Sequence, residues 1–409
     1  MTHFDIIIAG GGMAGATASL ALAQRGLKIA LVEPVEPSMD ASPSFDQRAV
    51  ALSAASISIY KTLGIWPSIQ PLACPITDIH VSDQGHLGFT RLKASDYGID
   101  ALGQVIPLDQ TGPILWRVIR QTDNIKLFCP SNIVEIDSIA CQQNNGQINV
   151  QISDQPNQQT LTGQLLIAAD GTFSSTAKMA GINIRRDSYN QHAVIANIST
   201  ELAHNNRAFE RFTKQGPLAL LPLTRNRMSL VWCQNDKNAC STMIDSDIDF
   251  IEKLQTAFGY RLGQIIKVGE RNQYPLALHL PEQTFNGRVL LLGNSAHTLH
   301  PIAGQGFNLG LRDIAALFDQ VQQAQIRGED IGSQPFLQSY QAQRQSDWKQ
   351  AIVATDSLIR IFSNDFLPLV IARNKALCLL DKIPLAKQKL AMAAMGFSGE
   401  SAQLTRGIR

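Results

Sequence analysis

Cysteine is sparse and unpatterned in this chain of 409 residues. Neither a C-x-x-C pair nor a metal-ligand spacing occurs, which excludes a disulfide scaffold and a cysteine-based metal site and predicts reduced thiols. The six cysteines are Cys74, Cys129, Cys141, Cys233, Cys240 and Cys378.

Long hydrophobic runs and an excess of one charge are also missing. No stretch reaches the roughly 18 uninterrupted apolar residues of a membrane-spanning helix. The 35 Lys and Arg residues balance 34 Asp and Glu residues, and the net charge of +1 gives no general attraction to nucleic acid. Residues 1–5 lead directly into an apolar strand pattern without a basic or apolar signal segment, so we expect a cytoplasmic location.

What is present begins with a glycine loop. The apolar run Asp5–Ala9 leads into Gly10-Gly11-Gly12-Met13-Ala14-Gly15 and then into an alanine-rich segment up to Gln24. This order of strand, G-x-G-x-x-G loop and helix is typical of dinucleotide binding. The first glycine permits a tight turn, the second lets backbone approach a pyrophosphate, and the third lets the helix pack closely on the strand. We therefore expect Gly10, Gly12, Ala14 and Gly15 to contact a dinucleotide.

Glu33 ends the next predicted strand, residues 28–32. An acid at this distance from the glycine loop accepts hydrogen bonds from a ribose hydroxyl, and it repels a 2′-phosphate. The pattern favours FAD or NAD over NADP. A glycine-rich turn without a ligand is the alternative, which the combined context of strands, helix and acid disfavours.

A second strand, loop and helix pattern occurs near the end of the chain. The apolar run Val289–Leu292 is followed by a glycine-rich loop from Gly293 to Gly310, with a helix predicted from about Asn308 to Gln320. A dinucleotide site built from the first unit alone does not need this loop, whereas an extended flavin cofactor does. Backbone N–H groups of Gly304-Gln305-Gly306, next to a helix start, suit the flavin edge where negative charge collects on reduction.

With two further segments, these motifs resemble the FAD-dependent aromatic hydroxylases, the class A flavoprotein monooxygenases. Residues 293–313 resemble their flavin signature, residues 165–174 their Asp-Gly motif, and residues 46–53 the segment whose arginine lies along the cofactor. Residues 298–313, 79–86 and 102–105 resemble the ubiquinone-biosynthesis branch. Beyond the glycine loop and Glu33, the resemblance implies FAD contacts at Arg48, Asp170, Gly171, Gly293, Asn294, Pro301, Gly304, Gln305, Gly306 and Asn308.

Two positions depart from the family pattern. Asn294 stands where the family usually has an aspartate, so a neutral amide faces the expected ribityl chain. Lys178 stands near the place of a common arginine, and a lysine lacks the planar two-point contacts of a guanidinium.

The resemblance implies an FAD-dependent monooxygenase with NADH or NADPH as reductant and O2 as co-substrate. Its expected substrate is a polyprenylated phenol of ubiquinone biosynthesis, 2-polyprenyl-6-methoxyphenol. We expect the backbone at Pro301 and Gly304 to line the ring site and stabilise developing charge, and we treat His300 as a hypothetical general base. His297 and His300 lack a third ligand, so we expect no metal site.

The implied fold is α/β, with a Rossmann-like FAD/NAD(P)-binding domain of the aromatic-hydroxylase type, an interleaved mixed β-sheet substrate domain and C-terminal helices. Cofactor motifs at residues 10, 48, 170 and 293 require a discontinuous FAD domain. We expect FAD-domain parts at 1–75, 104–180 and 285–345, substrate-domain parts at 76–103 and 181–284, and a C-terminal helical segment at 346–409.

The C-terminal segment combines an apolar helical pattern with basic residues, seven Lys or Arg against three Asp or Glu in residues 364–409. It is either a helix packed on its own domain or a face for a membrane or partner. A polyprenylated substrate favours peripheral contact with the inner membrane and association with other ubiquinone-biosynthesis proteins.

Three alternative functions stay open at this point. The enzyme hydroxylates another ring position of the same pathway, or it is an FAD-dependent dehydrogenase or oxidase, or it is a non-catalytic FAD-stabilised scaffold subunit. A dehydrogenase or oxidase shares the glycine loop and Glu33 but does not predict the Asp170-Gly171 and 293–310 signatures together. A product one oxygen atom heavier than the substrate discriminates among the enzyme classes.

Overall fold

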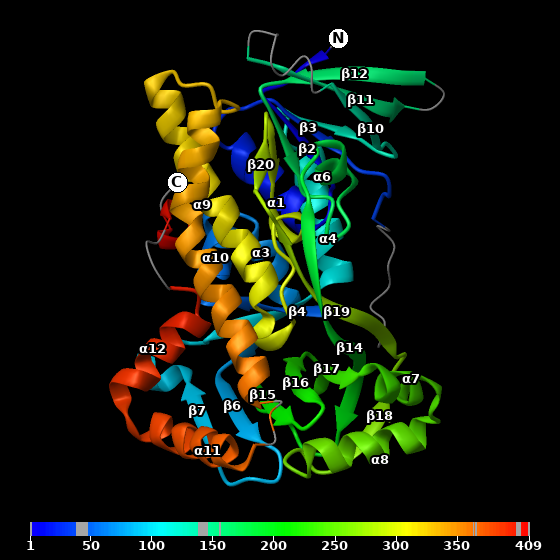
Figure 1. The fold of residues 1–409 in the computed structure, drawn as a ribbon, viewed down its shortest axis with the longest axis vertical. Coiled ribbons are helices and arrows are strands. Elements are labelled where there is room, and N and C mark those ends of the chain that lie inside the picture. The colour runs from blue at the N-terminus through cyan, green and yellow to red at the C-terminus, as the bar shows by residue number, and fades with distance from the viewer. Residues whose placement is uncertain are drawn as a thin grey trace.

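The structure, a computed structural model, describes residues 2–37, 48–137, 146–154, 157–362, 364, 366–397 and 402–407. Arg48 is therefore described, whereas Asp46 and Gln47 of the same motif lie outside the described residues. Figure 1 shows an elongated molecule in which layers of sheet and helix at one end join a second sheet at the other.

A six-stranded sheet forms the centre of the first layer, in the order β20-β21-β13-β2-β3-β9. Strands β21, β13, β2, β3 and β9 run parallel. Every residue of β2, β3 and β13 is buried, as expected for continuous apolar runs in a parallel sheet covered on both faces. The strands are β2 (Ile6–Ala9), β3 (Ile29–Val32), β9 (Ile125–Phe128), β13 (Leu165–Ala168), β20 (Phe285–Asn286) and β21 (Val289–Leu291).

Helices cover one face of this sheet and bring the two glycine loops together. Helix α1 (Met13–Ala23) follows β2 and packs between α4 (Leu108–Arg120) and α9 (Gln305–Arg327), and α10 (Gln334–Phe362) packs on α9. Helix α9 begins at Gln305, three residues before the predicted start, because the loop ends at Gly304 in a left-handed conformation.

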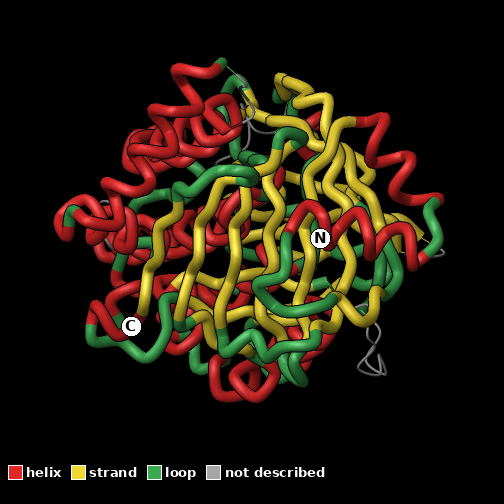
Figure 2. The backbone as a smooth tube through the Cα atoms, turned by 90° about the horizontal axis from the view of Figure 1, so that it is seen from below, coloured by secondary structure: helices red, strands yellow, loops and turns green. Residues whose placement is uncertain are grey.

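An eight-stranded sheet forms the second layer, with the path β18-β14-β17-β16-β15-β6-β7 and β19 paired to β14 (Figure 2). Only the β15–β6 pair is parallel among its described pairs, which makes the sheet mixed as predicted. The strands are β6 (Asp78–Asp83), β7 (Phe89–Lys93), β14 (Ile184–Thr200), β15 (Arg207–Thr213), β16 (Gly216–Leu223), β17 (Arg227–Asn235), β18 (Ile265–Val268) and β19 (Asn272–Pro281).

Strands β14 and β19 connect the two layers. Both run along the molecule in Figure 1, and their register extends from Ile184–Pro281 to Ile195–Asn272. A bridge between His279 and Thr298 ties β19 to the loop that follows β21. The loop 293–304 therefore lies where the two layers meet. Helices α7 (Asp236–Ile244) and α8 (Asp247–Phe258) cover the second sheet and share its core.

Two smaller sheets complete the strand structure. One has the order β1-β12-β11-β10 and the other the order β4-β8-β5. Their strands are β1 (Thr2–His3), β10 (Ile133–Asp137), β11 (Ile148–Asp154), β12 (Asn157–Gly163), β4 (Ala49–Ser53), β5 (Cys74–Ile76) and β8 (Gly103–Pro107). The remaining short helices are α2 (Ala54–Thr62), α3 (Trp66–Ile69), η1 (Gln70–Leu72), η2 (Ala94–Tyr97), α6 (Ser175–Met179), η3 (Gly293–Ser295) and η4 (Ile302–Gly304).

The C-terminal helices leave the first layer and return to it. Helices α11 (Leu367–Lys382) and α12 (Pro384–Ala394) lie beside the end of the second sheet, at the lower left of Figure 1. The last turn, η5 (Gln403–Arg406), then packs on α2 and α9, with Leu404 fully buried in the main core. Within the described ranges, no helix is both long enough and apolar enough to cross a bilayer. The domain boundaries stay a prediction.

Candidate functional site

The loop between β2 and α1 packs against the end of β13. A methyl group on Gly10 would lie 2.6 Å from the carbonyl oxygen of Ala169, and one on Gly15 would lie 1.8 Å from that of Gly10. Both positions thus require glycine because backbone approaches backbone. The same packing places the first glycine loop beside Asp170 and Gly171.

The loop after β21 joins the same place. Gly293 has a φ of +62°, and a methyl group there would lie 3.0 Å from the Cβ of Ala14. The backbone N–H of Gly171 donates to the Ser295 hydroxyl at 3.0 Å. The structure therefore brings the three motifs at residues 10–15, 170–171 and 293–295 into one site, although up to 285 residues separate them in the sequence.

Two helix N-termini at this site are left without a side-chain cap. Helix α1 starts after Gly12 and α9 starts after Gly304, and neither has a capping side chain or an acidic residue in its first turn. The first N–H groups of such helices are unsatisfied and attract anionic or electron-rich groups. Gly12 and Gly306 have no positive φ, and no protein atom lies within 4 Å of where their Cβ would be. Chain packing does not explain these glycines, whereas a ligand lying against the backbone does, so the residues present fit FAD.

Glu33 lies beside the first glycine loop. Its carboxylate accepts hydrogen bonds from the N–H of Gly11 at 2.5 Å and from that of Val35 at 3.0 Å. On the other side, the Trp116 indole donates to the Gly11 carbonyl oxygen at 2.9 Å. Gly11 is thus held from both sides, and Glu33 retains acceptor capacity at the end of β3 for a ribose hydroxyl.

The Asp170 carboxylate organises its own loop. It accepts from the Ser174 hydroxyl at 2.5 Å, from the backbone N–H of Thr176 at 3.0 Å and from the Ser295 hydroxyl at 3.3 Å. Asp170 therefore holds the start of α6 and joins it to η3. Gly171, with no protein atom within 4 Å of where its Cβ would be, presents open backbone at this point.

Asn308 was predicted to contact the cofactor, but its side chain bonds to other parts of the protein. Its Oδ1 accepts from the Ser53 N–H at 2.8 Å and the Ser56 hydroxyl at 2.7 Å. Its Nδ2 donates to the carbonyl oxygens of Ala51 at 2.9 Å and Gly304 at 2.8 Å. These four bonds use the full capacity of an amide. Within the described structure, the Asn308 side chain fixes α9 and the loop at Gly304 to β4 and α2.

The other predicted contacts are partly or fully exposed. Arg48 is exposed, donates to the Tyr274 hydroxyl at 3.4 Å, and lies 5.9 Å from the centre of that ring. Asn294 is exposed, whereas Pro301, Gln305 and Gly306 are half-buried. Lys178 is exposed on α6, beyond Asp170.

His300 is a buried, neutral histidine beside this loop. It is 1% exposed, and burial lowers its pKa to about 4. Its Nε2 lies 3.3 Å from Oε1 of Gln191, whose Nε2 donates to the carbonyl oxygen of Gln215 at 2.7 Å. That carbonyl only accepts, so it fixes the Gln191 amide, and His300 must carry its proton on Nε2. Nδ1 is then an acceptor, and it has no partner among the described residues. The Tyr189 ring meets the imidazole edge to face at 5.2 Å.

His297, in contrast, belongs to a buried cluster that holds helices together. Its Nε2 lies 2.6 Å from Oδ2 of Asp313, whose Oδ1 accepts from Arg344 at 2.7 Å and Trp348 at 2.8 Å. Burial by itself raises the pKa of Asp313, but Arg344 and His297 outweigh it and lower the pKa to about 2. The cluster of His297, Asp313, Arg344 and Trp348 thus ties the loop after η3 to α9 and α10.

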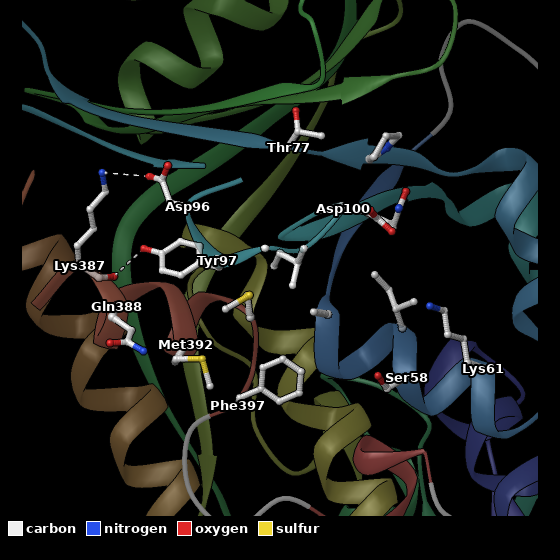
Figure 3. A pocket seen from close by; sticks show the side chains of 18 of the residues that line it. Ser58, Lys61, Thr77, Asp96, Tyr97, Asp100, Lys387, Gln388, Met392 and Phe397 are labelled. Atoms are coloured by element: carbon white, nitrogen blue, oxygen red, sulfur yellow. Dashed lines mark hydrogen bonds and ion pairs between the residues drawn. The ribbon is translucent and has the colours of Figure 1, made fainter. Parts of the chain in front are cut away.

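A cavity of about 1340 Å³ lies elsewhere, between α2, η2 and α12 (Figure 3). Met392, Phe397 and Tyr97 line it, with the Lys387–Asp96 ion pair at its edge. None of the predicted site residues is among those that line it.

Several residues of the site carry no sequence signal. Trp116, Gln191 and Ser295 act through partners 105, 109 and 124 residues away. Each occurs in an ordinary helix, strand or loop pattern, so only the folded structure identifies it. Ser295 is the partial exception, because it lies within the predicted loop 293–310.

Comparisons with known proteins agree with an FAD site. The family model described as "FAD binding domain" matches residues 3–355. The ubiquinone hydroxylase UbiL of Rhodospirillum rubrum is 30% identical over 411 residues, covering 99% of this chain and 93% of the relative. The 3-demethoxyubiquinol 3-hydroxylase of Escherichia coli is 29% identical over 398 residues, covering 96% and 98%. The crystal structure of p-nitrophenol 4-monooxygenase PnpA from Pseudomonas putida DLL-E4 matches with a TM-score of 0.79 at 17% identity, covering 98% of this chain and 100% of that one.

Proposed function

Because this chain belongs to the FAD-binding-domain family and is an FAD-dependent monooxygenase of the class A flavoprotein hydroxylases, we propose that it hydroxylates the aromatic ring of a polyprenylated phenol in ubiquinone biosynthesis. The observation that carries the proposal is that two uncapped helix N-termini, those of α1 and α9, belong to one site, and that the buried acceptor of His300 lies on the loop that leads into α9. The relatives named as ubiquinone hydroxylases support the substrate class.

When bound, FAD supplies electron transfer from NADH or NADPH and the reaction with O2. The overall conversion consumes an aromatic C–H, NAD(P)H, a proton and O2. It forms a C–O bond at the ring, and the electron pair of NAD(P)H reduces the second oxygen atom to water.

In the proposed site, the chain binds FAD along its full length. Glu33 accepts from the adenosine ribose, and the N–H groups after Gly12 hold the pyrophosphate. The backbone at Gly304, Gln305 and Gly306 faces the flavin ring, where it stabilises charge that develops on reduction. The full proposed set is Gly10, Gly12, Ala14, Gly15, Glu33, Arg48, Asp170, Gly171, Gly293, Asn294, Pro301, Gly304, Gln305, Gly306 and Asn308, with Asn308 acting through the loop that it holds.

The proposed catalytic groups are His300 and the backbone of Pro301 and Gly304. With Nε2 held by Gln191, His300 presents Nδ1 as an acceptor for the phenol hydroxyl of the substrate. A hydrogen bond to that hydroxyl increases electron density on the ring, which favours attack by an electrophilic oxygen. Its low pKa keeps the imidazole neutral, so this acceptor is present at neutral pH.

For the substrate, we propose 2-polyprenyl-6-methoxyphenol, with another ring position of the same pathway as the close alternative. A polyprenylated phenol reaches the enzyme from a bilayer, so we further propose peripheral contact with the inner membrane and association with other enzymes of the pathway. The C-terminal helices offer the surface for such contacts.

The test is single-turnover hydroxylation by the FAD-loaded protein. NADH or NADPH is added without oxygen, the loss of flavin absorbance is followed, and ¹⁸O2 is then admitted with and without a 2-prenyl-6-methoxyphenol. We expect flavin reduction, reoxidation, and a product that carries one ¹⁸O atom. Fragmentation of the product identifies the hydroxylated carbon.

Other outcomes select the alternatives. Reoxidation with stoichiometric hydrogen peroxide and no labelled product, for every phenol of the pathway, identifies an oxidase. Bound flavin that neither NADH nor NADPH reduces favours the scaffold subunit.

A further inference from the structure

Helix α11 presents apolar side chains to solvent. Leu367 is 67% exposed, Ile371 47% and Leu379 56%. Leu87, in the turn between β6 and β7, is 93% exposed and lines the same groove of about 610 Å³. The usual surface helix carries polar residues on its solvent side, so the exposed apolar side chains of α11 are unusual.

The inner side of α11 buries Val370 and Leu377, and polar contacts hold the helix in place. Arg373, 7% exposed, donates to the Asp83 carboxylate at 2.9 Å. Asn374 donates to the same carboxylate at 2.9 Å and accepts from the Gly88 N–H at 3.1 Å. These bonds fix both the rotation of α11 and the position of the turn that carries Leu87. Specific contacts therefore determine which side of α11 faces solvent.

Two lysines accompany the apolar side chains. Lys375 and Lys382 line the groove, are exposed, and are seven residues apart, which places them on one side of the helix. Neither makes an ion pair with any residue that the structure describes. The acidic neighbour on the helix, Asp381, instead accepts from Thr90 and from the backbone of Arg91.

We propose that Leu87, Leu367, Ile371, Lys375, Leu379 and Lys382, the α11 face, dock on a membrane surface that contains anionic phospholipid. Apolar side chains enter the boundary between headgroups and acyl chains, and the two ammonium groups lie at the level of the lipid phosphates. Charge complementarity favours this occupant, because lysine stems cover apolar surface while their charged ends reach a negative layer. The proposal names the surface for the membrane contact proposed above and in that respect rests on the proposed function, but it does not depend on the identity of the phenol.

The test is vesicle flotation of the full-length FAD-loaded protein. Vesicles of phosphatidylcholine with phosphatidylglycerol are compared with vesicles of phosphatidylcholine only. We expect binding to the first and little to the second. The double variant K375E/K382E should lower the partition constant by roughly tenfold or more, because each basic residue contributes measurably at an anionic surface. L87S/L367S should lower it by a similar factor, including at salt concentrations that screen the charges.

The matched control is K28E/K237E, which reverses two exposed lysines remote in sequence from the α11 face. It makes the same change in net charge and should retain vesicle binding. The NAD(P)H oxidation rate of each variant with a short-chain, water-soluble phenol should equal that of the wild type, which separates docking from turnover. Absence of wild-type binding, or an equal loss in K28E/K237E, overturns the proposal. A change of oligomeric mass in L87S/L367S also overturns it, because the face then contacts a second copy of the chain.

Discussion

Among single residues, Glu33 joins the glycine loop to the proposed adenosine site. Its carboxylate makes two hydrogen bonds to backbone N–H groups, and a glutamine has only one acceptor oxygen to replace them. We expect Glu33→Gln to weaken FAD binding about tenfold. Titration of the apoprotein with FAD, followed by flavin fluorescence, measures this. Glu36→Gln, three residues away and exposed, is the control, and equal affinities for both variants would remove Glu33 from the site.

Gln191 is a positioning residue for His300. Gln191→Leu removes the acceptor that holds the imidazole proton on Nε2, so the orientation of the Nδ1 acceptor is lost. We expect kcat for hydroxylation to fall about tenfold, with FAD affinity and the rate of flavin reduction unchanged. Stopped-flow measurement of each half-reaction separates these steps. Equal losses in both half-reactions would indicate structural damage instead of a role in positioning.

At the scale of elements, Asn308 fastens α9 to α2 and β4. Asn308→Ala removes four hydrogen bonds and leaves buried partners such as the Ser53 N–H without an acceptor. We expect a loss of about 3 kcal/mol in the free energy of unfolding. Urea denaturation of the apoprotein measures it. The exposed Asn183→Ala is the control, and a comparable small change in both variants would contradict the fastening role.

The cluster around Asp313 predicts a pH dependence. The pKa of Asp313 falls from 3.8 to about 2 on folding. Its ionisation therefore contributes about 2 kcal/mol of stability above the unfolded pKa, and this contribution is lost as pH falls from 4 towards 2. Asp313→Asn should flatten that part of the stability curve, measured by denaturation at several pH values. It should also cost about 3 kcal/mol at pH 7, because buried Arg344 keeps Asp347 but loses the Asp313 carboxylate, and His297 and Trp348 lose the same acceptor. An unchanged acid slope would rule out Asp313 as its source.

These elements show how far sequence reasoning extends. The strands at residues 6–9, 29–32, 165–168 and 289–291 were predictable, because continuous apolar runs next to glycine loops have few other solutions. The start of α9 was not predictable, because the backbone geometry at Gly304 depends on the bonds of Asn308. One partner of Asn308 is Ala51, which lies 257 residues before it in the chain. The same holds for Gln191 and Trp116, whose roles exist only across the folded layers.

On the scale of the whole molecule, the turn η5 packs on the first layer. The pattern predicted C-terminal helices, but not the turn η5, whose Leu404 is fully buried beside α2 and α9. Leu404→Ala should lower the free energy of unfolding by about 3 kcal/mol. The control is Leu385→Ala on α12, where the side chain is 71% exposed. This change should alter the free energy of unfolding by less than about 0.5 kcal/mol. Equal midpoints for the two variants in thermal unfolding would show that η5 does not support the core.

The strand order of the central sheet also determines when the sheet can be completed during translation. Strand β13 lies between β2 and β21, so the sheet lacks a member until residue 291 has been made, and the second helix start at the site follows only at residue 305. A ribosome-bound nascent chain therefore exposes an incomplete parallel sheet until residue 291 has emerged, a state that favours aggregation. Cofactor insertion must then wait until the start of α9 at residue 305 has been made.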